Sequence, residues 1–169
     1  MSLDDRLQEV RSLTRSFKYA FHGVAYCVSN ERNMRIHLVV TAYLLIFSLF
    51  YGLTATQYAV VALAIGMVLA AEAINTAVEV IVNMHTQHYD SLARIAKDIA
   101  AGAVLICTIF AVVIGCMIFL KPDKLKLIAD FFATNLLCGI LFLVSLPAAA
   151  VFIFSFPFKR NRRRFRGGR

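Results

Sequence analysis

The sequence predicts an all-α integral membrane protein, a helical bundle with an N-terminal amphipathic surface helix, three core transmembrane helices and a fourth, C-terminal one. Hydrophobic residues make up 60% of the 169 residues, and the mean hydropathy is +0.71. This composition is too apolar for a soluble domain of this size. Between Ile36 and Ala71 the chain has no Asp, Glu, Lys or Arg, and about 20 apolar residues suffice for a helix to cross the hydrocarbon core.

The N-terminal segment, residues 2–29, is predicted to form an amphipathic helix. Its apolar side chains recur at steps of three or four residues, which places them on one helical face, while Arg and Lys side chains project elsewhere. Such a helix is typical of the membrane interface, and packing on other protein is compatible with the same pattern. The apolar face consists of Leu3, Leu7, Val10, Leu13, Phe17, Phe21, Val24 and Val28.

Four membrane spans follow, separated by short polar breaks. Residues 52–57 form the turn between the first two spans, and Pro122 ends the third, because proline cannot continue a helix. Residues 83–98 are polar and expected in the cytoplasm, whereas residues 125–135 are mixed. The predicted spans are 36–53, 58–82, 99–120 and 136–158, which divide the chain into a main membrane domain (1–120), an extra C-terminal transmembrane segment (121–158) and a basic tail (159–169).

Positive charge predicts the orientation of these spans. The last eleven residues hold seven Lys or Arg, nearly all of the net charge of +8. The basic tail and the N-terminal helix both belong on the cytoplasmic side, which requires an even number of spans, although Lys121, Lys124 and Lys126 then lie outside. A basic tail beside a membrane span indicates attraction to anionic lipid headgroups rather than to nucleic acid.

A polar stripe interrupts the second span in the sequence LAAEAINTAVEVIVN, residues 69–83. At about 100° per residue, Glu72, Asn75, Glu79 and Asn83 fall on one helical face. Each intramembrane carboxylate costs roughly 3 kcal/mol, so such a stripe indicates a function. Glu72 lies seventeen residues after Ala55, about 25 Å along a helix, which places the stripe at the inner membrane interface.

Further polar groups reach the same interface from neighbouring spans, namely Glu31 before the first and Lys97 and Asp98 before the third. Carboxylates can hold Mg²⁺ or accept a proton from a hydroxyl, and a lysine can pair with phosphate oxygens. Two other interpretations stay open at this point. The stripe can join polar helix faces structurally, or it can form an ion or proton path in a small transporter.

Cysteine and histidine give no comparable signal. The four cysteines form no CxxC pair and three lie in apolar spans, where they are typical small hydrophobic residues. His85 and His88 are three residues apart and have no matching cysteine or histidine, so we do not expect a metal site there.

The segment EAINTAVEVIVN, followed by HYDSLARIAKDIAAGAVLI, resembles the signature of the prokaryotic diacylglycerol kinase family. Upstream, FKYAFHGVAYCVSNERNMRIH is similar to the Gram-positive branch that includes undecaprenol kinases, and the likeness covers about residues 12–120. The resemblance implies a homotrimeric lipid kinase of the bacterial cytoplasmic membrane with three transmembrane helices and an N-terminal surface helix. Such a kinase transfers the γ-phosphoryl of MgATP to a membrane lipid hydroxyl, that of diacylglycerol or undecaprenol.

The resemblance also implies roles for matching positions. Glu72 would be the general base and Asn75 would position substrate or phosphate. Glu31 and Glu79 would hold Mg²⁺ on the ATP phosphates. Nucleotide contacts would come from Tyr19, Glu31, Glu79, His88, Tyr89, Asp90, Lys97 and Asp98, those of His88 and Asp90 through the backbone.

Some positions depart from the family pattern. Asn83 stands where an acidic residue is common, and Ser12 stands where an arginine is often assigned to the site, so that Arg11 or Arg15 would have to substitute. The fourth span and the basic tail lie beyond the minimal length of the family. The apolar lining predicted for the lipid groove does not separate diacylglycerol from undecaprenol, and the segment NERNMRIH leans slightly toward undecaprenol.

Overall fold

The computed structural model describes residues 3–85 and 90–155 of the chain, and within these residues it contains helices and turns but no strand. The predicted all-α class is therefore confirmed. The helices are α1 (Leu3–Asn30), α2 (Arg32–Ser48), α3 (Ala55–His85), α4 (Ser91–Phe119), α5 (Pro122–Thr134) and α6 (Leu136–Phe154).

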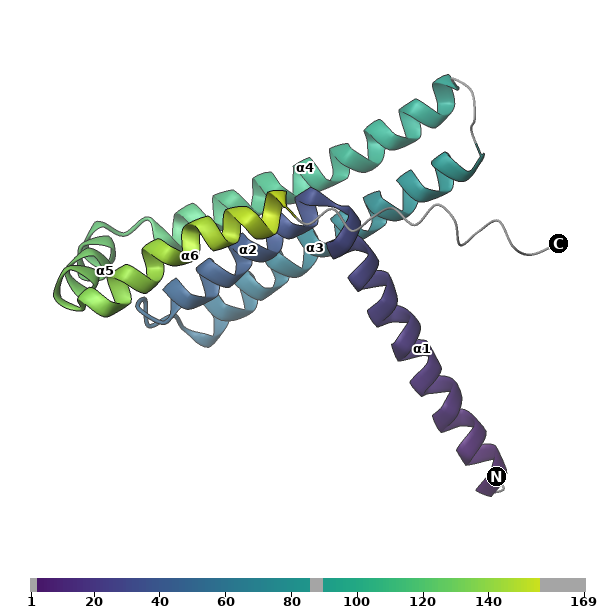
Figure 1. Ribbon diagram of the computed structural model, residues 1–169, viewed down its shortest axis with the longest axis horizontal. Coiled ribbons are helices and arrows are strands. Elements are labelled where there is room, and N and C mark those ends of the chain that lie inside the picture. Colours follow the sequence, from purple (N-terminus) through teal and green to yellow (C-terminus); the bar gives the residue numbers. More distant parts are fainter. Residues whose placement is uncertain (1–2, 86–89, 156–169) are drawn as a thin grey trace.

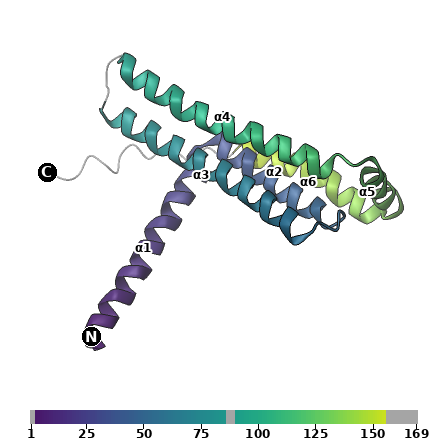
Figure 2. The same cartoon turned by 180° about the vertical axis from the view of Figure 1, so that it is seen from behind.

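Four of these helices, α2, α3, α4 and α6, run side by side in a bundle, and α1 leaves the bundle at a steep angle (Figure 1). The view from behind shows the same arrangement, with α5 at one end of the bundle (Figure 2). We call this end the Tyr51 end and the opposite one, where α1 meets α2, the Glu31 end. The α3–α4 hairpin extends beyond the Glu31 end by several turns (Figure 1).

Among the residues that the structure describes, three helices are long and apolar enough to cross a membrane, namely α3, α4 and α6. These correspond to the second, third and fourth predicted spans. The first predicted span, 36–53, is shorter than expected, because α2 has 17 residues and ends at Ser48. The chain then turns through Gly52, whose φ of +58° lies in the left-handed region that favours glycine.

A capping box begins α3. The Thr54 backbone N–H donates to Gln57 Oε1 at 2.9 Å, and the Gln57 N–H donates to Thr54 Oγ1 at 3.3 Å. This reciprocal pair satisfies two N–H groups that lack partners at a helix start. The helix runs for 31 residues, about 46 Å, which exceeds the hydrocarbon core of about 30 Å. Its last three turns therefore project past the core together with the first turns of α4.

The segment 125–135, whose sequence is mixed, is helical. Pro122 occupies the first turn of α5, where its missing N–H is not needed, and Asp123 complements the positive end of the helix dipole. Phenylalanines from α2, the following turn, α5 and α6 then form one aromatic cluster at the Tyr51 end. Its rings are those of Phe47, Phe50, Phe131, Phe132 and Phe142.

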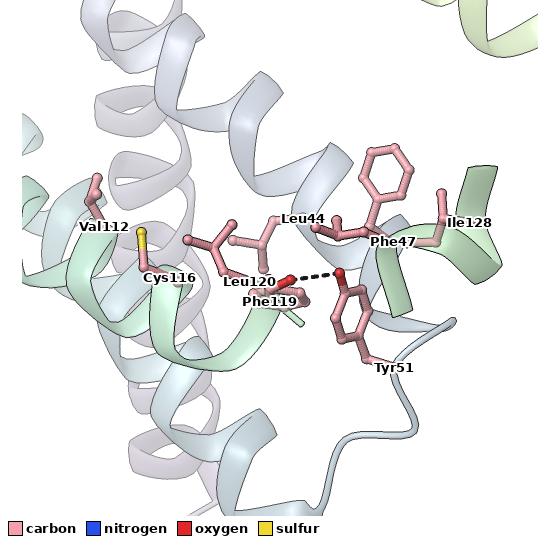
Figure 3. A pocket seen from close by; sticks show the side chains of 10 residues that line it. Leu44, Phe47, Tyr51, Val112, Cys116, Phe119, Leu120 and Ile128 are labelled. Atoms are coloured by element: carbon pink, nitrogen blue, oxygen red, sulfur yellow. Dashed lines mark hydrogen bonds between the residues drawn. The ribbon is translucent and has the colours of Figure 1, made fainter. Parts of the chain in front are cut away.

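An apolar cavity of about 500 Å³ also lies at the Tyr51 end, between α2, α4 and α5. The Tyr51 hydroxyl donates to the Phe119 carbonyl at 2.7 Å at its wall (Figure 3). This bond satisfies a carbonyl of the last turn of α4. No residue of the polar stripe lines this cavity, so it belongs to the packing of the Tyr51 end and not to the candidate site.

Candidate functional site at the Glu31 end

The polar stripe of α3 passes from a buried to an exposed environment. Glu72 is 1% exposed and Asn75 7% exposed, whereas Glu79 is half-buried and Asn83 is exposed. The predicted stripe therefore lies on the face of α3 that packs inside the molecule. Its last residue reaches the surface on the part of α3 that projects past the bundle.

The buried part of the stripe has few partners of its own. Asn75 Nδ2 donates to Glu79 Oε1 at 3.4 Å, one turn further along the helix. Within the described residues, four buried side-chain oxygen atoms lack a hydrogen-bond partner, and three of them are both Glu72 carboxylate oxygens and Asn75 Oδ1. An unpaired buried polar group costs about 1–3 kcal/mol, more if charged, so these oxygens mark a place where a ligand is expected.

Thr76, beside the stripe, is fully buried, but its role is local. Its hydroxyl donates to the Glu72 carbonyl at 2.9 Å, within the same helix. A serine or threonine that bonds back in this way satisfies its own polar atom and needs no ligand. The unpaired Glu72 carboxylate and the paired Thr76 hydroxyl therefore differ in what they can offer to a bound molecule.

Glu31 joins the stripe from the junction of α1 and α2. Its backbone N–H donates to the Cys27 carbonyl at 2.8 Å, and its own carbonyl accepts from the Arg35 N–H at 3.4 Å. Burial raises the pKa of the Glu31 carboxyl above its ordinary value, the Glu79 carboxylate raises it further, and the Arg35 guanidinium opposes both effects. The charges of Glu31 and Glu79 also act on Glu72. The structure thus places Glu31, Glu72 and Glu79 close enough for their charges to act on one another.

Lys97 and Asn83 meet across the α3–α4 hairpin. Lys97 Nζ donates to Asn83 Oδ1 at 2.8 Å. The amide at position 83, which departs from the family pattern, therefore serves as the acceptor for the predicted phosphate-binding lysine. Asp98, next to Lys97, is exposed and lies 3.8 Å from Arg94 in a pair within α4.

Asp90 caps the start of α4. Its Oδ1 accepts from the N–H groups of Leu92 at 2.8 Å and Ala93 at 3.3 Å, as expected of an aspartate in this position. His88 and Tyr89 lie outside the described residues. Tyr19 is 64% exposed on α1 and stands twelve residues before Glu31, about 18 Å along the helix, so this chain does not bring it to the carboxylates.

The carboxylates suit a magnesium ion shared with a phosphate ligand. Within the described residues, no three His, Cys, Asp or Glu side chains gather into a metal cage. Mg²⁺ keeps several waters and is usually held by one or two carboxylates together with substrate phosphates. Glu31 at the junction of α1 and α2 and Glu79 on α3, whose charges act on each other, offer two such carboxylates.

Comparison with known proteins identifies the family of this chain. The sequence profile of the prokaryotic diacylglycerol kinase family matches residues 18–119. The chain belongs to the prokaryotic diacylglycerol kinase family. The predicted family and the predicted lipid kinase function are thereby confirmed, and a kinase implies a nucleotide phosphoryl donor. Residues 18–119 contain every predicted site residue, whereas α5 and α6 lie beyond them.

Two relatives share this region. The chain is 40% identical over 116 residues to the diacylglycerol kinase of Synechocystis, which is 68% of this chain and 66% of that protein. It is 32% identical over 120 residues to the undecaprenol kinase of Bacillus subtilis, which is 71% of this chain and 98% of that protein. The chain thus spans slightly less than two thirds of the first relative and nearly all of the second. No solved structure gives a significant match.

One polar residue near the site was not predicted. Arg35 is 6% exposed, on the first turn of α2. The sequence signal was present, because Arg35 is the last charged residue before a long uncharged segment, and such a residue indicates a cation at a membrane boundary. Its partners, however, are backbone carbonyls, which no sequence pattern reveals.

Proposed function

We propose that the chain transfers the γ-phosphoryl group of MgATP to the hydroxyl of a long-chain membrane lipid alcohol at the Glu31 end of the bundle. The observation that carries this proposal is the Glu72 carboxylate. It is almost fully buried, both of its oxygens lack a partner within the described residues, and two more carboxylates act on it. The hydroxyl of a membrane lipid can donate a hydrogen bond to this carboxylate, and it reaches the site from the bilayer side.

Glu72 then acts as the general base. Its carboxylate accepts the proton of the lipid hydroxyl while that oxygen forms a bond to the γ-phosphorus, and the bond between this phosphorus and the bridging oxygen of ADP breaks. Such proton transfer contributes about 10²- to 10⁴-fold to a rate. Asn75, whose amide nitrogen is held by Glu79, keeps its unpaired oxygen available to orient the acceptor.

Glu31 and Glu79 hold the magnesium ion, which when bound neutralises charge on the ATP phosphates. Lys97 lies on the projecting hairpin, where it is held by Asn83, and it neutralises charge that develops on the transferred phosphoryl group. Asp98 is exposed beside it and contacts nucleotide, as do Tyr89 and Tyr19, the latter from another subunit. Asp90 and His88 contribute through the backbone.

The surrounding surface supports a membrane setting with the Glu31 end on the cytoplasmic side. Leu13, Phe17, Phe21 and Val24 on α1 are all more than half exposed, so this part of the predicted apolar face is open to its surroundings. These four exposed side chains suit the lipid interface, while the bundle crosses the bilayer beside them. Exposed apolar side chains on α3 and α4 are available for the expected homotrimer, and the basic tail for anionic headgroups.

The acceptor class follows from the site, and the two relatives supply the compounds to test. One relative is named a diacylglycerol kinase and the other an undecaprenol kinase. Both lipids carry a hydroxyl on long hydrocarbon. The purified chain in anionic lipid vesicles should transfer labelled phosphate from ATP to at least one of them, as resolved by thin-layer chromatography.

Transfer to neither lipid would overturn the proposal. Flux of ions or solutes through the same vesicles without a labelled lipid product would instead favour the transporter interpretation of the stripe. Removal of Mg²⁺ by a chelator should abolish the labelled product, and readdition should restore it.

A further inference from the structure

The buried side chain of Arg35 joins the C-terminal helix α6 to the Glu31 end. Arg35 Nε donates to the Ile153 carbonyl at 3.1 Å, and its Nη1 donates to the carbonyls of Val28 at 3.0 Å and Ser29 at 3.3 Å. Val28 and Ser29 lie in the last turn of α1, and Ile153 lies in the last turn of α6. One guanidinium therefore binds the ends of two helices.

These contacts have a clear physical cause. The last four carbonyls of a helix have no partner within it and carry the negative end of the helix dipole. A guanidinium is planar, always charged and presents several donors in a fixed fork, so it can satisfy carbonyls of two helices at once. Burial at 6% exposure makes each of these bonds costly to lose.

The same residue also fixes the backbone on both sides of Glu31. The guanidinium holds the Ser29 carbonyl, two residues before Glu31, and the Arg35 backbone N–H donates to the Glu31 carbonyl itself. Glu31 is a proposed magnesium ligand whose side chain projects from this short junction. The guanidinium therefore holds backbone that lies two residues from the Glu31 side chain.

Two further contacts between α2 and α6 are in register with the bond from Arg35 to Ile153. Tyr43, eight residues after Arg35, shares a hydrogen bond of 2.8 Å with Ser145, eight residues before Ile153. Phe47 then packs on Phe142 with ring centroids 5.7 Å apart. The two antiparallel helices are thus matched along their length, which aligns the Ile153 carbonyl with Arg35. Only residues 18–119 match the family, so α6 is an addition that reaches the site region through this arginine.

We propose that Arg35 is a positioning residue through which α6 holds Glu31 in its metal-binding place. This inference rests on the proposed function, because it assigns Glu31 to magnesium. It gives α6 a part in the phosphoryl-transfer site that an anchoring helix would not have. Partners that orient metal ligands typically change metal affinity by about 10- to 100-fold when removed, which sets the size of the expected effect.

The test uses full-length protein and measures the Mg²⁺ concentration that gives half-maximal transfer, at saturating ATP and lipid. Arg35→Met should raise this concentration by about 10-fold or more, while the rate at saturating Mg²⁺ changes much less. Arg35→Lys keeps the positive charge but loses the forked arrangement of donors, so an intermediate increase in this Mg²⁺ concentration is expected. The Lys variant provides the test if the Met variant does not fold. Unchanged Mg²⁺ dependence in both folded variants would overturn the proposal.

Two controls separate this effect from charge and from general loss of packing. Arg32→Met removes a neighbouring positive charge that is exposed, and Tyr43→Phe removes a second side-chain hydrogen bond between α2 and α6. Both should leave the Mg²⁺ dependence unchanged. An increase in either variant as large as that of Arg35→Met would refute a specific role of Arg35.

The part played by α6 is tested with Ile153→Pro, which distorts the last turn that carries the accepting carbonyl. On its own, this change should raise the half-maximal Mg²⁺ concentration several-fold. In the double variant with Arg35→Met it should cause little further increase, because both changes act through one contact. Multiplicative effects would show that α6 does not act through Arg35. Mn²⁺ affinity in the presence of a non-hydrolysable ATP analogue, measured by EPR, reports the effect of these variants on metal binding without turnover. This measurement therefore separates failure of the present inference from failure of the kinase proposal.

Discussion

Replacing Glu72 by Gln removes one buried charge. The structure predicts that this change lowers the rate of phosphoryl transfer and raises the stability of the protein. The side chain is 1% exposed and neither carboxylate oxygen has a partner within the described residues. Glutamine has the same shape but cannot accept the hydroxyl proton. We expect transfer to fall by about 10²- to 10⁴-fold, the usual contribution of a general base.

Stability should move the other way in the same variant. A buried carboxylate with no partner, in the field of Glu31 and Glu79, is a destabilising element of the empty site. Glutamine leaves a buried polar group in place but removes its charge, so the free energy of unfolding should rise by on the order of 1 kcal/mol. Thermal unfolding in detergent, followed by circular dichroism, measures this change.

A matched control is Thr76→Val, one turn along the same helix and equally buried. It removes a hydroxyl that bonds the Glu72 carbonyl, so stability should change by about 1 kcal/mol or less while transfer persists. If Glu72→Gln kept more than about a tenth of the activity, well above the loss expected for a general base, Glu72 would not be the base. If it instead destabilised the protein and prevented assembly, the structural interpretation of the stripe would be correct.

Three further changes test the rest of the site. Lys97→Met should lower kcat/KM for ATP by about 10²-fold or more through loss of a phosphate-neutralising charge, and an unchanged value would remove Lys97 from the site. Asn83→Asp replaces the amide that accepts a hydrogen bond from Lys97 with a carboxylate. Because an exposed ion pair contributes up to about 1 kcal/mol, KM for ATP should change by no more than about fivefold. Asp90→Ala should lower stability by about 1 kcal/mol, because it removes the N-cap of α4. Asp90→Asn keeps this cap and should leave KM for ATP unchanged. A large rise in KM for Asp90→Asn would mean that the carboxylate contacts nucleotide.

Local pattern was enough to predict much of this architecture. The three- and four-residue steps of the first segment predicted a helix over 2–29, and α1 spans Leu3–Asn30. The spacing of the stripe predicted a shared face for Glu72, Asn75 and Glu79, and their graded burial agrees. Helical periodicity is a property of neighbouring residues, so it can be recognised without the rest of the chain.

The features that were missed depend on partners distant in sequence or on weak local signals. α5 has a mixed composition because one side packs on the aromatic cluster, and mixed composition does not separate a helix from a loop. The pairing of Asn83 with Lys97 requires the α3–α4 hairpin, and the bond of Arg35 to Ile153 joins positions 118 residues apart. The Thr54–Gln57 capping box, in contrast, was a readable local signal of where α3 begins.

The Arg35 contact has a consequence for how the protein is made. Arg35 precedes Ile153 by 118 residues, and at about 5–20 residues per second of synthesis this separation corresponds to about 6–24 s. During that time the guanidinium has the α1 carbonyls but not the acceptor on α6. The corner that presents Glu31 is therefore completed last, after the final helix has entered the membrane, and a nascent chain that stops short of α6 leaves the ribosome with this corner unfinished.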